Sequence, residues 1–212
     1  MLATQADLRL SRDWETISLD GSILFLASQF ESTIRDMAES FISNIGTKFR
    51  QYTDIPESIR NQNLKLIGRL LQDYSKTQYA HISYNQVVQE LADCLTKGTP
   101  VRLFALGFTF HEHNMNSGQL SELYHRAEIA DFWRAVAAFP ELKTYLQVNQ
   151  TDLASRVARE KLDAFMEQRN QIAHRGPNYQ TVGDAIVLDY IAFFKVLVPA
   201  IADVLETKLA TY

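Results

Sequence analysis

Residues 151–175 read TDLASRVAREKLDAFMEQRNQIAHR, and this stretch decides the fold class. Apolar side chains recur every three or four residues, the spacing that places them on one face of an α-helix: Leu153, Val157, Leu162, Phe165, Met166, Ile172 and Ala173. Thr151 and Asp152 are of the types that begin helices, and Gly176 and Pro177 end the pattern. The sequence therefore predicts one long amphipathic helix with polar side chains gathered in its last turns.

Helical spacing also covers most of the remaining chain. The start signal Asp20-Gly21-Ser22 and the helix-breaking Gly46 bound a first long helix, and residues 1–12 are expected to form an arm. Further helices are predicted at residues 56–79, 84–96, 118–128, 130–138, 140–148 and 181–209, the last with a kink or break near Pro199. Residues 101–116 alternate apolar and polar side chains in part, so a short strand or an extended segment stays open there. We predict an all-α helical bundle in a single domain, residues 1–212, with residues 98–148 as an insertion of mixed short elements between its N- and C-terminal helix pairs.

Composition excludes several classes of protein. Of 212 residues, 46% are apolar and 22% charged, which is typical of a globular chain and not of a disordered one. The net charge of −4 argues against a broad nucleic-acid-binding surface, so any RNA contact is expected to be local. The richest apolar run, residues 185–205, is interrupted by charges, and the N-terminus does not resemble a secretory signal. The single cysteine, Cys94, excludes an intrachain disulfide. We expect a cytoplasmic protein without a membrane contact.

Arg169, Asn170 and His174 bring complementary chemistries to the end of the long helix. Arginine is a permanent cation whose planar fork of donors fits phosphate oxygens. Histidine exchanges protons near neutral pH, and the negative end of the helix dipole favours its protonated form. Asn170 and His174 are four residues apart, so they share a helix face and the amide can orient the ring. These groups suffice to cleave a phosphodiester without a metal ion. The alternative is a surface arginine and a histidine that only stabilises the helix end.

The pattern Arg-Asn-x-x-x-His near the end of a penultimate helix resembles the signature of the HEPN superfamily, most closely that of its ribonuclease-toxin and defence branches. Glu31 and Arg35, in the first long helix, resemble the Glu-x-x-x-Arg/Lys motif of many HEPN nucleases. The resemblance implies that Arg169, Asn170 and His174 are catalytic and that Glu31 orients Arg35 or Arg169. The alternative for Glu31 and Arg35 is an ordinary exposed ion pair. Residues 98–148 match no HEPN element.

The spacing within the motif raises a geometric difficulty. Arg169 and His174 are five residues apart, so their side chains leave an ideal helix about 140° apart. A composite site removes the difficulty, because two copies related by a two-fold axis can complete each other's clefts. The resemblance implies the same arrangement. We therefore predict a homodimer through residues 151–210, with both copies of His174 near the axis.

Other polar clusters predict no cofactor and no metal. His111, His113 and nearby His125 lack a cysteine partner and the helical His-Glu-x-x-His spacing of zinc hydrolases, so we interpret them as loop or surface histidines. The sequence contains no glycine-rich phosphate loop and no nucleophile elbow. Aromatic side chains of the insertion are expected in the core, with a stacking surface for RNA or a partner as the alternative: Phe104, Phe108, Phe110, Trp133 and Phe139. The insertion either packs beside the motif or thickens the core elsewhere.

The sequence thus predicts a metal-independent endoribonuclease that cleaves single-stranded RNA. The resemblance implies a toxin or phage-defence role in a prokaryotic cytoplasm, with an antitoxin or regulatory protein as a further partner. The alternative function is a non-catalytic all-α module that binds nucleotides or another protein. Toxins of this superfamily that a partner enzyme modifies carry a tyrosine two residues after the histidine, and here that position is Gly176.

Overall fold

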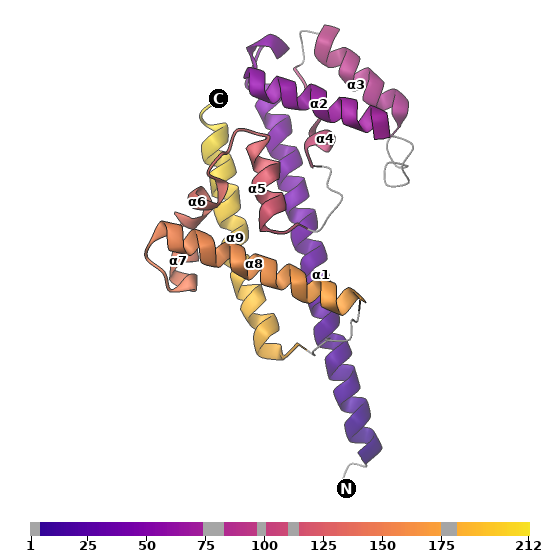
Figure 1. Ribbon diagram of the computed structural model, residues 1–212, viewed down its shortest axis with the longest axis vertical. Coiled ribbons are helices and arrows are strands. Elements are labelled where there is room, and N and C mark those ends of the chain that lie inside the picture. Colours follow the sequence, from indigo (N-terminus) through magenta and orange to yellow (C-terminus); the bar gives the residue numbers. More distant parts are fainter. Residues whose placement is uncertain (1–4, 74–82, 97–100, 110–114, 175–181) are drawn as a thin grey trace.

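The spine of the molecule is α1, a helix of 43 residues that spans Gln5–Thr47 (Figure 1). The computed structural model describes residues 5–73, 83–96, 101–109, 115–174 and 182–212. Buried side chains recur along the inner face of α1: Ile23, Ala27, Phe30, Ile34, Ala38, Phe41 and Ile45. The prediction that this helix begins at Asp20 is wrong. Asp20 lies on the buried face, and the helix extends back to Gln5 without a proline to stop it.

A second long helix, α9 at Asp184–Leu209, runs beside α1 in the same direction (Figure 1). The ring centroids of Phe30 and Phe194 lie 4.6 Å apart, and further along those of Phe49 and Tyr212 lie 5.9 Å apart. Because both residue numbers rise together, the two helices are parallel. α9 continues through Pro199 without a break, since the proline is exposed and its missing hydrogen bond faces solvent.

α9 is also the one helix of the described residues that is long and apolar enough to cross a membrane, judged by length and composition alone. A core helix of a soluble protein meets the same criterion. Phe193, Leu197 and Ile201 are buried in the core, as this alternative requires. Only 39% of the most apolar part of α9 is buried, so its outer face stays uncovered in the single chain.

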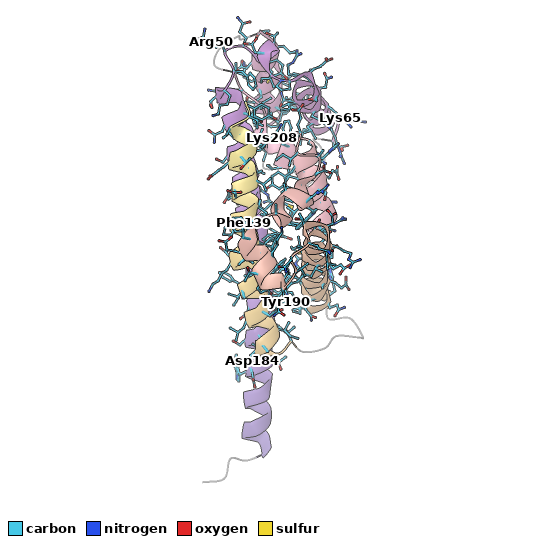
Figure 2. All side chains as sticks on the ribbon, turned by 90° about the vertical axis from the view of Figure 1, so that its left-hand side faces the viewer. Arg50, Lys65, Phe139, Asp184, Tyr190 and Lys208 are labelled. Atoms are coloured by element: carbon cyan, nitrogen blue, oxygen red, sulfur yellow. The ribbon has the colours of Figure 1, made fainter. Side chains whose placement is uncertain are left out.

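A second layer of helices covers one side of α1 and α9 (Figures 1 and 2). Its longest member, α8 at Thr151–His174, crosses both spine helices. The other three are α5 at Ser117–His125, α6 at Phe132–Ala137 and α7 at Pro140–Leu146. The prediction of three short helices in this part of the chain is therefore confirmed.

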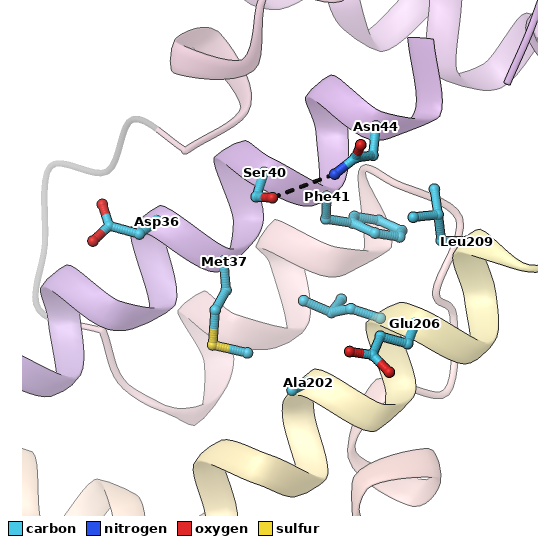
Figure 3. Close-up of a pocket in the computed structure, with 9 residues that line it drawn as sticks. Asp36, Met37, Ser40, Phe41, Asn44, Ala202, Glu206 and Leu209 are labelled. Carbon is cyan, nitrogen blue, oxygen red and sulfur yellow. Dashed lines mark hydrogen bonds between the residues drawn. The ribbon is translucent and has the colours of Figure 1, made fainter. Parts of the chain in front are cut away.

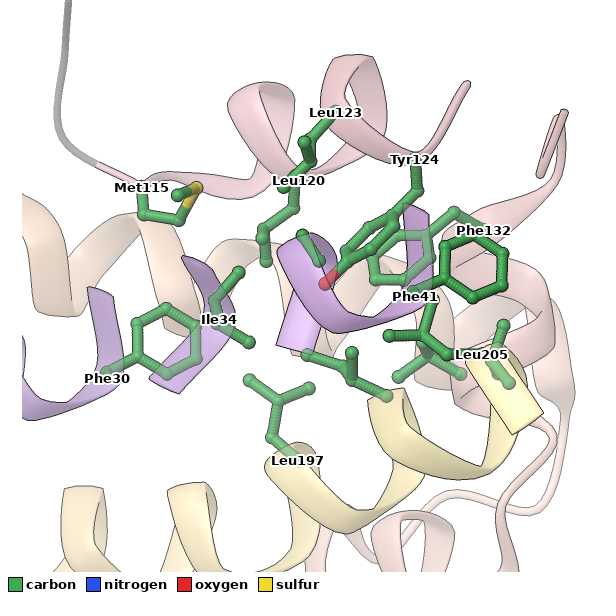
Figure 4. Packing of buried hydrophobic residues seen from close by; sticks show 14 of the residues in the cluster. Phe30, Ile34, Phe41, Met115, Leu120, Leu123, Tyr124, Phe132, Leu197 and Leu205 are labelled. Atoms are coloured by element: carbon green, nitrogen blue, oxygen red, sulfur yellow. The ribbon is translucent and has the colours of Figure 1, made fainter. Parts of the chain in front are cut away.

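Aromatic and aliphatic side chains from both layers form one core (Figure 4). Tyr124 stacks on Phe132 with ring centroids 4.5 Å apart, and both rings are buried. Phe108 and Trp133 are buried as well, which confirms the core interpretation of the aromatic residues; Phe110 lies outside the described residues. Residues 98–148 therefore supply a large part of the core.

An ion pair surrounded by aromatic rings fixes α7, α8 and α9 to one another. Lys161 of α8 pairs with the carboxylate of Asp189 in α9, which also accepts a hydrogen bond from the Tyr145 hydroxyl of α7. The Lys161 ammonium lies 5.4, 5.6 and 5.8 Å from the ring centroids of Tyr145, Tyr190 and Phe193. Cation–π contacts of this kind stabilise a partly desolvated charge.

A smaller helical unit sits on the C-terminal end of α1. It contains the 3₁₀ helix η1 at Tyr52–Asp54, α2 at Glu57–Asp73, α3 at Tyr84–Thr96 and α4 at Ala105–Thr109. The alternative of a short strand within residues 101–116 is wrong, because Ala105–Thr109 form α4 and the described residues contain no strand.

Asn63 of α2 joins the parts of this unit through its buried side chain. Its amide donates to the Tyr52 hydroxyl at 3.2 Å and to the Cys94 sulfur at 3.4 Å, and its carbonyl oxygen accepts the backbone N–H of Phe104 at 2.9 Å. Because these groups are buried, each bond replaces one that water would otherwise supply.

Candidate active site

α8 holds the predicted motif in regular helix up to its last residue. Leu162, Phe165 and Met166 anchor the helix in the core, and Ile172 is buried within the motif itself. The helix ends at His174, one residue before the predicted end, and Gly176 and Pro177 lie outside the described residues. The motif therefore stands on a rigid element.

The three predicted catalytic side chains differ in exposure. Arg169 and Asn170 are half-buried, whereas His174 is exposed. The Arg169 Nη1 atom donates a hydrogen bond of 3.1 Å to Oδ1 of Asn170. Because Asn170 and His174 are four residues apart and share a helix face, this bond links the guanidinium to a side chain on the face that carries the imidazole.

The predicted accessory pair lies on α1, which α8 crosses (Figure 1). Glu31 is half-buried, and its Oε1 atom accepts the backbone N–H of Met115 at 3.4 Å. Arg35, one turn further along α1, is exposed. Within the described residues no ion pair joins Glu31 to Arg35, because the glutamate is engaged by the chain that leads into α5.

Asp163 and Ser117 form a contact between α8 and the start of α5 that the sequence did not reveal. Ser117 donates its backbone N–H to Asp163 at 2.8 Å and its hydroxyl at 2.7 Å. Trp133 donates its indole N–H to the carbonyl oxygen of Ser117 at 2.9 Å. Asp163 precedes Asn170 by two turns on one face of α8. The start of α5 is therefore fixed to the face of α8 that carries Asn170 and His174.

Residues 115–117 are thus held between α1 and α8, by Glu31 on one side and Asp163 on the other. This part of the predicted insertion packs on α8 two turns before Asn170, and the helices that follow contribute buried core residues. The expectation that the insertion packs beside the motif stays a prediction. Asn116 caps α5 by accepting the backbone N–H of Gln119. Because asparagine is a preferred residue at helix starts, the sequence did contain a signal for the start of α5.

The predicted histidine cluster lies mostly outside the described residues, and the described cavities lie away from the motif. His111 and His113 lie outside the described residues. In the part of the chain that is described, no three His, Cys, Asp or Glu side chains are grouped as a metal site would need. His125 is exposed and lines a polar cavity of about 520 Å³ beside α2, together with Lys65 and Arg126.

A groove of about 520 Å³ also runs between α1 and α9 (Figure 3). Met37, Phe41 and Leu205 contribute apolar surface to it, and Asp36 and Glu206 add carboxylates. None of the motif residues lines either cavity. Among the described residues, the candidate active site is therefore the face of α8 that carries Asn170 and His174.

Comparison with known proteins gives one match. No curated protein and no solved structure matches the chain. A family model, RiboL-PSP-HEPN, matches residues 10–207, which includes α1, the motif helix and the whole of residues 98–148. The chain therefore belongs to the RiboL-PSP-HEPN family, within the HEPN superfamily.

Proposed function

We propose that the protein is a metal-independent endoribonuclease. The 2′-hydroxyl oxygen of a single-stranded RNA attacks the adjacent phosphorus, and the bond from phosphorus to the 5′-oxygen of the next nucleotide breaks. The products are a 2′,3′-cyclic phosphate and a 5′-hydroxyl. The observation that carries the proposal is the grouping of Arg169, Asn170 and exposed His174 at the end of α8, with the Arg169 guanidinium hydrogen-bonded to Asn170.

Each side chain has a defined task in this reaction. Arg169 binds the phosphate and neutralises the negative charge that increases as phosphorus becomes five-coordinate. His174 transfers a proton at a ring nitrogen, which histidine can do near neutral pH in both directions. Asn170 holds the guanidinium and shares its face with the imidazole, so it fixes their relative orientation. Glu31 and Arg35 support the site from α1.

The same reaction favours a two-fold homodimer. Transesterification needs one group to remove the proton of the 2′-hydroxyl and another to give a proton to the departing 5′-oxygen. The motif supplies one imidazole per chain. Two copies with the ends of α8 near the axis would supply one base and one acid to a shared cleft.

We further propose a toxin or phage-defence role in a prokaryotic cytoplasm, with an antitoxin or regulatory protein as a partner. Family membership supports this setting, and a buried, reduced Cys94 suits a reducing compartment. The net charge of −4 favours a short, local RNA contact, in line with a small cleft at one helix end.

The test incubates labelled single-stranded RNA with purified protein, with and without EDTA, and analyses the product ends. Cleavage that survives EDTA and leaves cyclic phosphate ends is expected, and His174→Ala should abolish it. His125→Ala is the matched control, since His125 is also an exposed histidine in the last turn of a helix. A folded His174→Ala protein that cuts at the wild-type rate would refute the mechanism.

A second candidate function follows from the acidic charge of the chain. A net charge of −4 suits a protein or nucleotide partner better than long RNA. In this reading the protein is a non-catalytic all-α module. Absence of RNA cleavage by the wild-type protein would select it over the nuclease.

A further inference from the structure

An exposed apolar stripe follows the N-terminal half of α1 on the side opposite the core. Four large apolar side chains are exposed there, with exposed fractions of 68% for Trp14, 51% for Ile17, 38% for Leu24 and 67% for Phe25. Positions 14, 17, 21, 24 and 28 alternate three- and four-residue steps, which is the spacing of a seam between two helices. A stripe of this kind is unusual on a monomer, which seldom exposes contiguous apolar surface.

The N-terminal end of α1 projects beyond the rest of the molecule (Figure 1). The stripe runs along α1 into the part whose opposite face is buried at Ile23 and Ala27. Further along α1 the face that carries the stripe is occupied by α4. Thr109 of α4 donates its hydroxyl to Glu39 at 2.9 Å, and Glu39 lies about seven turns from Trp14, hence on the same face. Among the described side chains, the face is therefore exposed from Trp14 to Ser28 and is covered by α4 at Glu39.

We propose that the stripe is the surface on which a second copy of this chain docks, with the two α1 helices antiparallel. This proposal rests on the proposed function only where it gives the pairing a role at the active site. It places the main dimer interface on α1 instead of on residues 151–210, the interface expected from the sequence.

The choice of a second copy follows from self-complementarity. In an antiparallel seam with Trp14 opposite Leu24 of the partner, Ile17 falls opposite Gly21 of the partner. Gly21 is exposed, and a Cβ atom placed on it would meet nothing within 4 Å, so the surface is open for a bulky neighbour. Large side chains of each copy thus meet small or apolar ones of the other, as an isologous contact demands.

The direction follows from α4. In a parallel pair both α4 helices would stand on the contact face at the same level and would force the helices apart. In the antiparallel register Gln5 of the partner stands opposite residue 33, six residues before Glu39. The described part of the partner helix therefore ends before the level at which α4 covers the face.

The exposed aromatic surface supplies part of the area that a stable contact needs. Trp14 and Phe25, both about two-thirds exposed, together offer on the order of 250 Å² of aromatic surface per copy. The rest of a standard contact, roughly 800 Å² per partner, can come from the flanking faces along the seam. Because α8 crosses α1 shortly before its C-terminal end, the pairing would also bring the partner chain near the motif (Figure 1).

The first test measures molar mass by light scattering at micromolar concentration. The wild type should be a dimer, and Trp14→Glu and Phe25→Glu should be monomers with unchanged far-ultraviolet circular dichroism. Leu95→Glu in α3 and Leu188→Glu in α9 are matched controls, exposed by 62% and 63%, and should stay dimeric. A monomeric wild type, dimeric α1 variants or a monomeric Leu188→Glu would each overturn the proposal.

The second test fixes the direction by oxidative cross-linking. Trp14→Cys and Leu24→Cys should not cross-link alone and should cross-link when the two variants are refolded together. Cross-linking of either variant alone would show a parallel pair and refute the proposal. RNA cleavage is measured separately, so a dimer that cuts no RNA would contradict the proposed function and leave the docking surface intact.

Discussion

Removing one of the two His174 side chains from a dimer tests whether the cleft is shared. The heterodimer carries wild-type His174 in one chain and His174→Ala in the other, obtained by co-expressing two tagged forms and purifying on both tags. His125 is the other histidine of the described residues, and it lines a cavity without motif residues. If each chain formed its own site, the heterodimer would keep half of the wild-type rate.

The shared cleft predicts a much larger loss. With one imidazole missing, either the base or the acid of the reaction is absent from every cleft, and each such group contributes about 10²–10⁴ in rate. We expect the heterodimer to lose at least roughly 100-fold, close to the loss of the homodimeric variant. Single-turnover cleavage of labelled RNA measures this difference, and a heterodimer with one His125→Ala chain is the control. A heterodimer that cuts at half the wild-type rate would refute the shared cleft.

Four further changes test the structure around the site. Asn63→Ala should lower the free energy of unfolding by about 2–4 kcal/mol, because it leaves buried partners without a hydrogen bond; urea denaturation measures this. Asp163→Ala removes both hydrogen bonds that hold the start of α5, and should destabilise by about 1–3 kcal/mol and slow RNA cleavage, whereas Asp163→Asn should recover part of both. Tyr124→Phe should leave stability unchanged or raise it by up to about 1 kcal/mol, since the buried hydroxyl has no hydrogen-bond partner among the described residues; a clear loss of stability would refute this. Burial alone would raise the pKa of Asp189, but hydrogen bonds from Lys161 and a tyrosine outweigh it and lower the pKa below 3.8, so the advantage of wild type over Asp189→Asn should hold at neutral pH and shrink as the pH falls below about 4.

Much of the fold could be predicted because helical spacing is a local property. α3 was predicted at its observed bounds, and the three short helices of the second layer were found within a few residues. The start of α1 was missed because Asp-Gly-Ser is a start signal only where the preceding chain is not helical. Here Asp20 is buried in the middle of a continuous helix, a fact set by tertiary packing.

The residues of the candidate site could be predicted from the sequence, but the hydrogen bonds that hold the neighbouring elements could not. Arg169, Asn170 and His174 stand together in the sequence, so a motif can reveal them. Glu31 and Asp163 approach residues 115–117 from helices far apart in the chain. Hydrogen bonds across such sequence distances depend on how α1 and α8 cross, which no local pattern encodes.

The reactivity of the Cys94 thiol can be used to measure the opening of the smaller helical unit. Burial raises the pKa of the Cys94 thiol more than the hydrogen bond from Asn63 lowers it, and the nearby carboxylates of Glu90 and Asp93 raise it further. A thiol that is both buried and protonated reacts with alkylating reagents only when its surroundings open. The rate of Cys94 alkylation therefore reports how often α2 and α3 separate. While the two helices stay packed, Cys94 does not react with reagents directed at a cysteine introduced on the surface.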